Sequence, residues 1–173
     1  EEKGGILAFL PGVGEIERTA ERLSLPPGVA LHKLHGQADP AAQRAALQPG
    51  AGRKLVLATS IAETSLTIDG VRTVIDSGLA RVPVYEPDIG VTRLETRRVS
   101  RAAADQRRGR AGRTEPGVCY RLWEEAATGA LEAFARPEIL SADLSPLLLD
   151  CAAWGVGDPT TLSFLDPPPA PAL

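Results

Sequence analysis

The sequence predicts an α/β fold in which a parallel sheet is flanked by helices. Four short apolar runs have the length of buried strands, and the segments between them carry helix signals. Strands that alternate with short helices form parallel sheets, because each crossover returns the chain across one face of the sheet. With 173 residues, 43% of them apolar, the chain can bury the core of one domain and a small appendage.

The expected elements follow in chain order. The strands are residues 6–10, 29–34, 54–59 and 71–76, and the first helix runs from Glu15 to about Leu23. Asp39 and Pro40 form a helix N-cap followed by proline at the first helical position, which predicts a short helix over residues 41–47. Ligands of open α/β sheets bind at the carboxyl ends of the strands, so we expect the site there.

The second half of the chain departs from this pattern. Residues 82–87 and 91–96 alternate around Asp88-Ile89-Gly90, which predicts an inserted β-hairpin at about residues 82–98. An Ala-rich helix is expected to end near Ala135, and another to run from Ser145 to about Trp154. We therefore expect a domain of residues 1–123 and a short helical C-terminal extension of residues 124–173, whose Pro-rich tail is a linker.

Positive charge is concentrated in one window of the chain. Residues 93–113 hold eight arginines against Glu95 and Asp105, so the window carries about +6. The whole chain is net −3, which leaves about −9 for the remainder. A separation of this size predicts a site that faces an anion.

Three side chains of this window are expected to converge. If the segment from residue 100 is helical, Arg110 and Arg113 share one face, with Gln106 one turn earlier. These residue types suit phosphoryl transfer, in which negative charge spreads over phosphate oxygens. A solvated basic helix or an electrostatic nucleic-acid patch is the alternative. Gly109 and Gly112 argue against it, because each costs roughly 1 kcal/mol inside a helix and only a backbone pressed against a partner needs them.

Four segments together resemble a known family. Residues 106–113 have the sequence QRRGRAGR, which resembles motif VI of the superfamily 2 helicases in its DEAH form. Residues 59–70 resemble motif V, with Ser60 in place of Asn, and residues 10–16 resemble motif IV. Residues 34–43 resemble the motif after it, and the order and spacing are those of the family. Within the DEAH/RHA-type RNA helicases, the chain is most similar to the bacterial HrpB type.

The resemblance implies a RecA-like domain, the second of two motor domains. The chain has neither a GxxxxGK[ST] phosphate loop nor a DEAH sequence, so ATP and Mg²⁺ would be held by the first RecA-like domain of the full-length protein. By resemblance, Arg110 and Arg113 are arginine fingers and Gln106 positions the attacking water. The other implied nucleotide-binding residues are Asp69, Thr67, Gly109 and Leu47, and the implied nucleic-acid-binding residues are Gly12, Val13, Thr59, Ser60 and Arg93.

Two departures from the family pattern affect these roles. Leu47 stands where many relatives place an aromatic residue, so it offers apolar contact to a base without a π face. Pro11 stands where relatives often have Thr, so a side-chain hydroxyl contact to nucleic acid is lost there.

The sequence thus predicts the second motor half of an ATP-dependent RNA helicase, inactive by itself. Its expected partners are RNA, with DNA as the alternative, and the first RecA-like and winged-helix domains of the same protein. The other function class is an inert nucleic-acid-binding or adaptor domain, which would have no reason to keep Gln106, Arg110 and Arg113 together.

Composition supplies the remaining expectations. A chain that begins Glu-Glu-Lys and has no Met is expected to be a fragment. The cysteines and histidines lack the spacing of metal ligands, so we expect no metal site here. We find neither a signal peptide nor an apolar run of membrane-spanning length, and expect a cytoplasmic protein that does not enter a membrane.

Overall fold

A computed structural model describes residues 4–50, 52–64, 66–86, 88–113 and 115–169. The chain forms two compact units. The first holds residues up to 81 together with 96–135, and the second holds 82–95 together with residues from 136 onward. The last part of the expected linker, residues 170–173, lies outside the described residues. The expected domain boundary after residue 123 stays a prediction.

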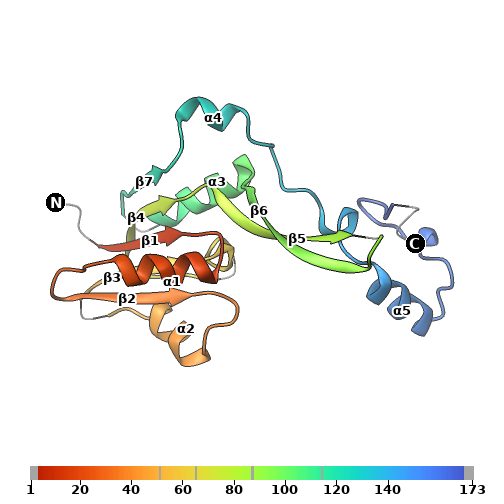
Figure 1. Ribbon diagram of the computed structural model, residues 1–173, viewed down its shortest axis with the longest axis horizontal. Helices are drawn as coiled ribbons and strands as arrows, with labels where there is room; N and C mark the ends of the chain where they lie inside the picture. The colour runs from red at the N-terminus through yellow and green to blue at the C-terminus, as the bar shows by residue number, and fades with distance from the viewer. Residues whose placement is uncertain (1–3, 51, 65, 87, 114, 170–173) are drawn as a thin grey trace. The chain divides into compact units, whose positions relative to one another are not determined.

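A five-stranded parallel sheet forms the centre of the first unit, in the order β2-β3-β1-β4-β7 (Figure 1). The strands are β1 (Gly5–Phe9), β2 (Val29–Leu34), β3 (Arg53–Ala58), β4 (Val71–Asp76) and β7 (Val118–Arg121). The predicted α/β class and the four predicted strands are confirmed. The sequence analysis missed β7, whose Val118 and Tyr120 are 41% and 49% exposed, because an edge strand of this kind lacks a continuous apolar run.

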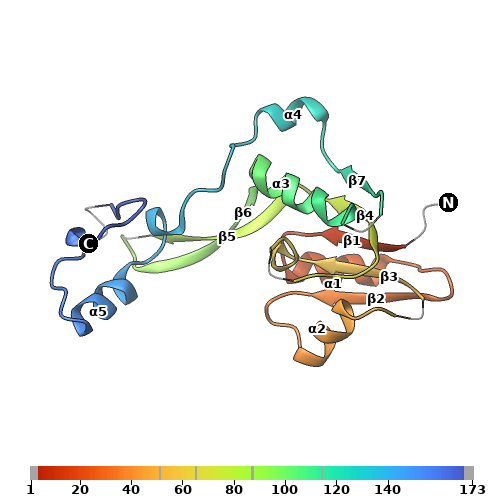
Figure 2. The same cartoon turned by 180° about the vertical axis from the view of Figure 1, so that it is seen from behind.

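Helices cover the sheet on both faces, as Figures 1 and 2 show from opposite sides. Helix α1 (Val13–Arg22) packs through Ile16 on one face, with Ala8 and Leu57. The other face carries α2 (Pro40–Leu47), α3 (Arg101–Arg108) and the 3-10 turn η2 (Gly109–Ala111), over a core that includes Leu7, Phe9 and Val74. Alternate residues of β1 therefore serve the two cores, as the two-residue period of a strand requires.

Side-chain caps begin two of these helices. The Oδ1 atom of Asp39 accepts a hydrogen bond from the amide of Ala41 at 2.6 Å, with Pro40 next in the chain, as predicted. The Oγ atom of Ser100 accepts from the amide of Ala103 at 3.2 Å and starts α3. Such caps satisfy amides that have no partner within the helix.

The expected Ala-rich helix ending near Ala135 is wrong in its extent. Helix α4 covers only Glu125–Gly129. Beyond it, the carbonyls of Glu132 and Ala133 accept from the amides of Arg101 and Ala102 at 2.8 and 3.1 Å. The helix does not continue there, and these carbonyls instead satisfy amides in the first turn of α3.

The predicted hairpin is present as β5 (Leu79–Glu86) and β6 (Val91–Arg98), a two-stranded sheet with Gly90 at φ 64° in its turn. The second unit also contains α5 (Ser145–Ala153) and two 3-10 turns, η3 (Glu138–Leu140) and η4 (Pro159–Thr161). No helix in the described part of the chain is long and apolar enough to cross a membrane.

Candidate functional site

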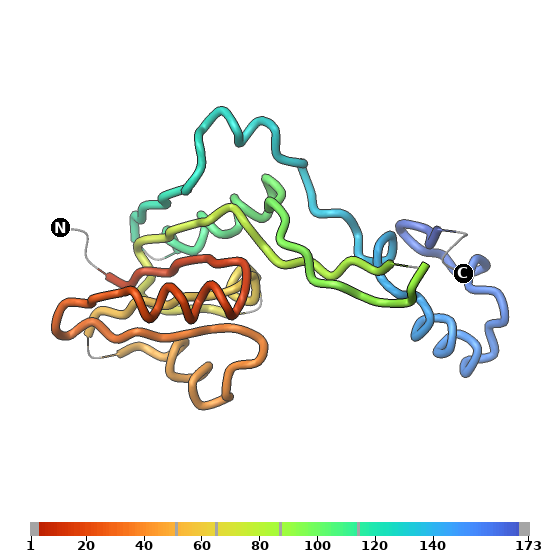
Figure 3. Tube along the Cα trace, viewed as in Figure 1, coloured from red at the N-terminus to blue at the C-terminus, as the bar shows by residue number. Residues whose placement is uncertain are grey.

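The segment of residues 59–70 runs from the carboxyl end of one strand of the sheet to the amino end of another. It leaves the carboxyl end of β3, where the amide of Thr59 donates to Leu34 at 3.1 Å, and forms the 3-10 turn η1 (Ser60–Ala62). It then crosses the face that carries α3 and returns to the amino end of β4, where Gly70 accepts from the amide of Gly5 at 2.7 Å. In the chain trace of Figure 3 this segment lies behind β1 and α1. The end of the segment, with Asp69, lies at the amino ends of the strands, because a parallel crossover must return to the opposite end of the sheet. The expected ligand site at the carboxyl ends stays a prediction.

Arg107 is a charged residue with no exposed surface that packs against this segment. Its Nε and Nη2 atoms lie 2.7 and 2.6 Å from Oε1 of Glu63, and its Nη1 lies 2.8 Å from Oδ1 of Asp76. Nη1 also donates to the carbonyl of Leu79 at 3.1 Å, and the guanidinium lies 4.9 Å from the centre of the Phe9 ring. We call Arg107, Glu63, Asp76 and Phe9 the Arg107 cluster.

Arg110 is nearly as buried, with 6% exposure, and bonds to the main chain of the same segment. Its Nε donates to the carbonyl of Glu63 at 2.8 Å, Nη2 donates to the same oxygen, and Nη1 donates to the carbonyl of Leu66 at 2.6 Å. Burial lowers the pKa of Arg110, as does the positive charge of Arg113, while Glu63 opposes the shift. The guanidinium stays protonated, because its ordinary pKa is far above neutral.

Arg113 and Gln106 are exposed, in contrast to Arg107 and Arg110. The Nη1 atom of Arg113 donates to Oγ1 of Thr67 at 3.0 Å. The expectation that Gln106, Arg110 and Arg113 share one helix face is wrong. Helix α3 ends at Arg108, the turn η2 carries Arg110, and Arg113 follows that turn. The helix ends here because two glycines in four residues weaken it and the burial of Arg110 directs the chain towards the segment of residues 59–70.

The glycines of this turn are not explained by packing among the described residues. A Cβ atom added at Gly109 or Gly112 would meet nothing within 4 Å. The backbone angles of Gly109, φ −60° and ψ −12°, are also ones that any other residue type can adopt. Gly117 is different, because its Cβ would lie 1.7 Å from the carbonyl oxygen of Ala111. The space beside Gly109 and Gly112 is thus open to an outside group.

Asp69 is exposed and lines a hollow of about 300 Å³ at the amino edge of the sheet. Lys54 also lines it, and its Nζ donates to the carbonyls of Ala46 and Gln48 at 3.0 and 3.2 Å. Burial lowers the pKa of Lys54, and the charge of Asp69 opposes the shift. Leu47, at the end of α2, is partly buried against the core of this face. Lys54 thus ties β3 to the end of the helix that carries Leu47.

The candidate nucleic-acid residues of the first unit gather at the carboxyl edge. Phe9 of β1 is paired with Ala58 of β3, so the loops that follow these strands, with Gly12 and Thr59, start side by side. Gly12 is buried and precedes α1, and a Cβ there would lie 2.9 Å from Nε of Arg81 and 3.0 Å from Oε2 of Glu15. Val13 begins α1 and Ser60 is exposed in η1. In the second unit, Arg93 of β6 is 59% exposed and forms an ion pair with Glu86.

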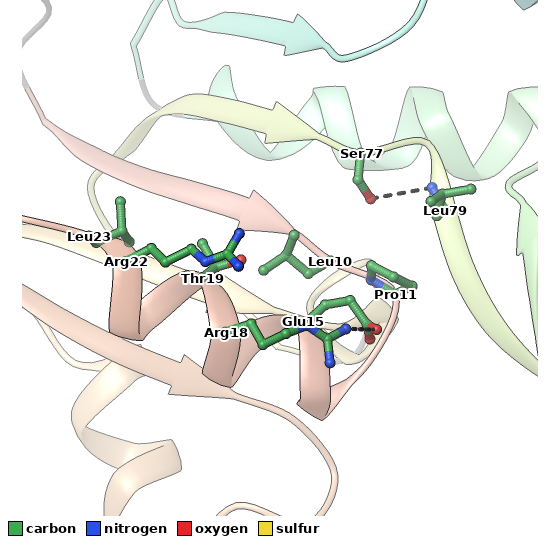
Figure 4. A pocket seen from close by; sticks show the side chains of 9 residues that line it. All are labelled: Leu10, Pro11, Glu15, Arg18, Thr19, Arg22, Leu23, Ser77 and Leu79. Atoms are coloured by element: carbon green, nitrogen blue, oxygen red, sulfur yellow. Dashed lines mark hydrogen bonds and ion pairs between the residues drawn. The ribbon is translucent and has the colours of Figure 1, made fainter.

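A separate groove of about 420 Å³ lies on the other face, beside α1 (Figure 4). Arg18 and Glu15 form an ion pair at 2.6 Å on its rim, and Ser77 accepts from the amide of Leu79. None of the predicted site residues lines it. Because α3 and η2 pack on the opposite face, this groove is not part of the arginine site.

Fold and site together define a class: a parallel α/β domain in which an arginine-rich turn packs on a hydroxyl-rich crossover. The chain belongs to the helicase conserved C-terminal domain family, which matches residues 1–115. It is 48% identical to the ATP-dependent RNA helicase HrpB of Escherichia coli over 98% of this chain and 21% of that protein. It is 41% identical to the probable ATP-dependent RNA helicase DHX34 of Homo sapiens, over 100% of this chain and 16% of that protein.

The solved structures agree with the sequence relatives. The crystal structure of the Escherichia coli DEAH/RHA helicase HrpB matches with a TM-score of 0.90 and 47% identity, over 98% of this chain and 22% of that chain. The predicted resemblance to DEAH/RHA helicases is confirmed. The chain spans about a fifth of the length of HrpB, so the activity of a whole helicase remains a proposal for this protein.

Three polar residues of the Arg107 cluster were missed by the sequence analysis. Arg107 lies inside the recognised arginine run and Glu63 inside the recognised crossover, but no role was assigned to either. Their separation of 44 residues, and the 31 residues from Arg107 to Asp76, hide the contacts from any local pattern. One signal for Arg107 was present in the sequence: it follows Gln106 directly, so on a helix its side chain points to a different face from that of Gln106.

Proposed function

We propose that this chain is the second motor domain of an ATP-dependent RNA helicase of the DEAH/RHA type. The observation that supports this most directly is the hydrogen bond of Arg113 to Thr67. It joins residues 101–113, which we call the arginine turn, to residues 59–70, which we call the crossover, and both side chains are exposed. Gln106 lies in the last turn of α3, and Gly109, whose Cβ position is open, is the C-cap of that helix. Such a surface suits a phosphate chain presented by another domain.

The chemistry assigned to this surface is stabilisation of charge. Phosphoryl transfer spreads negative charge over phosphate oxygens, and fixed guanidinium groups stabilise it. We assign Arg113 and Arg110 as arginine fingers and Gln106 as the group that orients water. To contact a phosphate, Arg113 needs only to break its hydrogen bond to the Thr67 hydroxyl. Arg110 must exchange its bonds to the carbonyls of Glu63 and Leu66 for bonds to phosphate oxygens.

The rest of the nucleotide site is assigned to the same side of the domain. Asp69 and Thr67 offer oxygen ligands to the ribose or to metal-bound water, and Leu47 offers an apolar edge to the base. No group of three or more His, Cys, Asp or Glu side chains in the described ranges could hold a metal. We assign ATP and Mg²⁺ mainly to the first RecA-like domain, where Mg²⁺ would neutralise phosphate charge.

The nucleic-acid contacts are assigned to the carboxyl edge and the hairpin. The amides of Gly12 and Val13 and the hydroxyls of Thr59 and Ser60 suit the phosphates and sugars of a strand. Arg93 supplies charge. RNA is the proposed strand because both named relatives are RNA helicases, with DNA as the alternative. The partner domains are the first RecA-like domain and a winged-helix domain of the same protein.

The inert adaptor is kept as the second candidate by one observation. Arg110 has structural partners of its own, so its retention by itself does not require catalysis. Gln106 and Arg113 are exposed, and the hydrogen bond of Arg113 to the Thr67 hydroxyl is a surface contact.

An ATPase assay separates the two candidates. The full-length protein should hydrolyse ATP faster with RNA than without it, and DNA in parallel reports the strand preference. Residues 1–173 alone should show no hydrolysis above buffer and weak, salt-sensitive RNA binding. A full-length protein without nucleic-acid-stimulated ATPase would support the adaptor, and turnover by the fragment alone would contradict the assignment of ATP to another domain.

A further inference from the structure

The Arg107 cluster joins three parts of the first unit that are separate in the chain. Glu63 closes the turn η1, its amide donating to Ser60 at 2.9 Å. Asp76 ends β4, and its Oδ1 also accepts from the amide of Gly78 at 2.9 Å. Leu79, whose carbonyl accepts from Arg107, begins the hairpin strand β5. One guanidinium therefore holds the crossover, the end of β4 and the root of the hairpin.

Stability alone explains this cluster poorly. The side chains of Arg107 and Asp76 have no exposed surface and that of Glu63 has 15%, so three charges are taken largely out of water. Buried ion pairs are often no better for stability than apolar residues of the same volume. Oδ2 of Asp76 is buried without a hydrogen-bond partner among the described residues, so the network does not satisfy all its members.

The position of the cluster suggests what it does. On one side, Glu63 is at the end of the turn that starts after Thr59, which is assigned to the RNA strand. On the other side, the next turn of the chain after Arg107 carries Arg110, which grips the carbonyl of the same Glu63. The side chain of Glu63 is thus fixed by Arg107 and its main chain by Arg110. A shift of η1 would therefore have to move the turn that carries Arg110, and a shift of that turn would have to move η1.

We propose that Arg107 is a positioning residue that couples nucleotide binding to nucleic-acid binding, through its ion pairs with Glu63 and Asp76. It touches neither ligand. Movement of the crossover when a strand binds at Thr59 and Ser60 is transmitted by Glu63 and Arg107 to the turn that presents Arg110 and Arg113. This inference rests on the proposed function, because it requires both ligands.

The test measures coupling in the full-length protein. The dissociation constant of a fluorescent single-stranded RNA is determined with and without a non-hydrolysable ATP analogue, and the ratio of the two constants is the coupling factor. The variant Glu63→Gln keeps the size and the main-chain bond to Arg110 but removes the ion pair. Arg107→Lys keeps the charge but replaces the guanidinium with one ammonium. The guanidinium contacts two carboxylates and a carbonyl, and a single ammonium cannot reproduce that forked geometry. Arg108→Ala is the matched control, since Arg108 is 63% exposed and pairs with Asp105 at 3.5 Å.

The wild-type ratio should differ from one by about fivefold or more, a usual size for coupling between sites. In Glu63→Gln it should fall close to one, while RNA affinity without nucleotide and analogue affinity without RNA each stay within about threefold, a change smaller than the coupling itself. Stimulation of the ATPase by RNA should fall together with the coupling ratio. A residue that only holds the fold together would lower the melting temperature without moving this ratio.

Each outcome is decisive. A Glu63→Gln ratio equal to that of the wild type overturns the inference and leaves the proposed function intact. A loss of coupling in Arg108→Ala equal to that in Glu63→Gln also overturns it, because the effect would not belong to the cluster. A wild-type protein that binds RNA but shows neither coupling nor ATPase sinks the proposed function itself. If Arg107→Lys does not fold, Glu63→Gln alone decides.

Discussion

The arginine turn of residues 101–113 and the hairpin of residues 79–98 hold five and four arginines, respectively, but use them differently. In the turn, Arg107 and Arg110 are 0% and 6% exposed and bond to carboxylates and main-chain carbonyls. In the hairpin, Arg93 is 59% exposed and forms a surface pair with Glu86. The first kind of arginine organises the backbone, and the second adds charge to a surface. The density of arginines in a sequence does not distinguish them.

The turn itself contains both kinds. Arg107 and Arg110 point inward and hold the crossover, whereas Arg108 and Arg113 are exposed. Four arginines within seven residues therefore divide into two that are buried, Arg107 and the proposed finger Arg110, and two that are exposed, Arg108 and the proposed finger Arg113. Substitutions can test this division directly.

Removal of Arg107 should have the largest effect on stability. Arg107→Ala leaves two buried carboxylates without their partner, which should lower the free energy of unfolding by about 3–5 kcal/mol. Urea unfolding of residues 1–173 followed by circular dichroism measures the change. Arg108→Ala is the control and should stay within about 0.5 kcal/mol. A loss below about 1 kcal/mol for Arg107→Ala would mean that its ion pairs are dispensable to the fold.

Removal of Arg113 should act on catalysis and leave the fold intact. Arg113→Ala in the full-length enzyme should lower kcat for ATP by something on the order of 10³-fold, because an arginine that stabilises developing charge is lost. Steady-state ATPase assays with RNA measure it, and Arg108→Ala should keep most of the activity. Greater damage from Arg108→Ala would show that the exposed arginines have been assigned in the wrong order.

Gly109→Ala should separate stability from function at one position. The backbone at Gly109 is helical and its Cβ position is open, so the change should raise the free energy of unfolding of residues 1–173 by about 0.4–1 kcal/mol. The same methyl group should lower ATPase of the full-length enzyme, by up to about 10²-fold if it displaces a reacting group. Unchanged ATPase in a stabilised variant would remove this backbone from the nucleotide site.

Arg93→Ala should have the smallest effect of the four. Loss of one exposed charge should weaken RNA binding by the full-length protein about threefold and reduce the slope of log affinity against log salt by about 0.7. Glu86→Gln frees Arg93 from its surface pair and should shift affinity in the opposite direction. Binding titrations at several salt concentrations measure both. Equal slopes in the wild type and Arg93→Ala would place the hairpin charge away from the strand.

The sequence by itself determined the class of fold, four strands of the sheet, the helix capped by Asp39, the hairpin and the family. These features are local, because apolar periodicity, an Asp-Pro cap or a run such as QRRGRAGR is complete within a few residues. The sequence also singled out the arginine turn and the crossover. It predicted the wrong extent for the helix after β7, because the carbonyls of Glu132 and Ala133 are used by the start of α3, 31 residues earlier in the chain.

Only the tertiary structure decided which arginine does what. Helical spacing alone placed Arg110 and Arg113 on one face, but the helix ends at Arg108 and packing buries Arg110 against the carbonyls of Glu63 and Leu66. Arg107 gained its partners through contacts with residues 31 and 44 positions away. Burial of a charge depends on what the folded chain brings to it from a distance. Sequence spacing along one element carries no information about that.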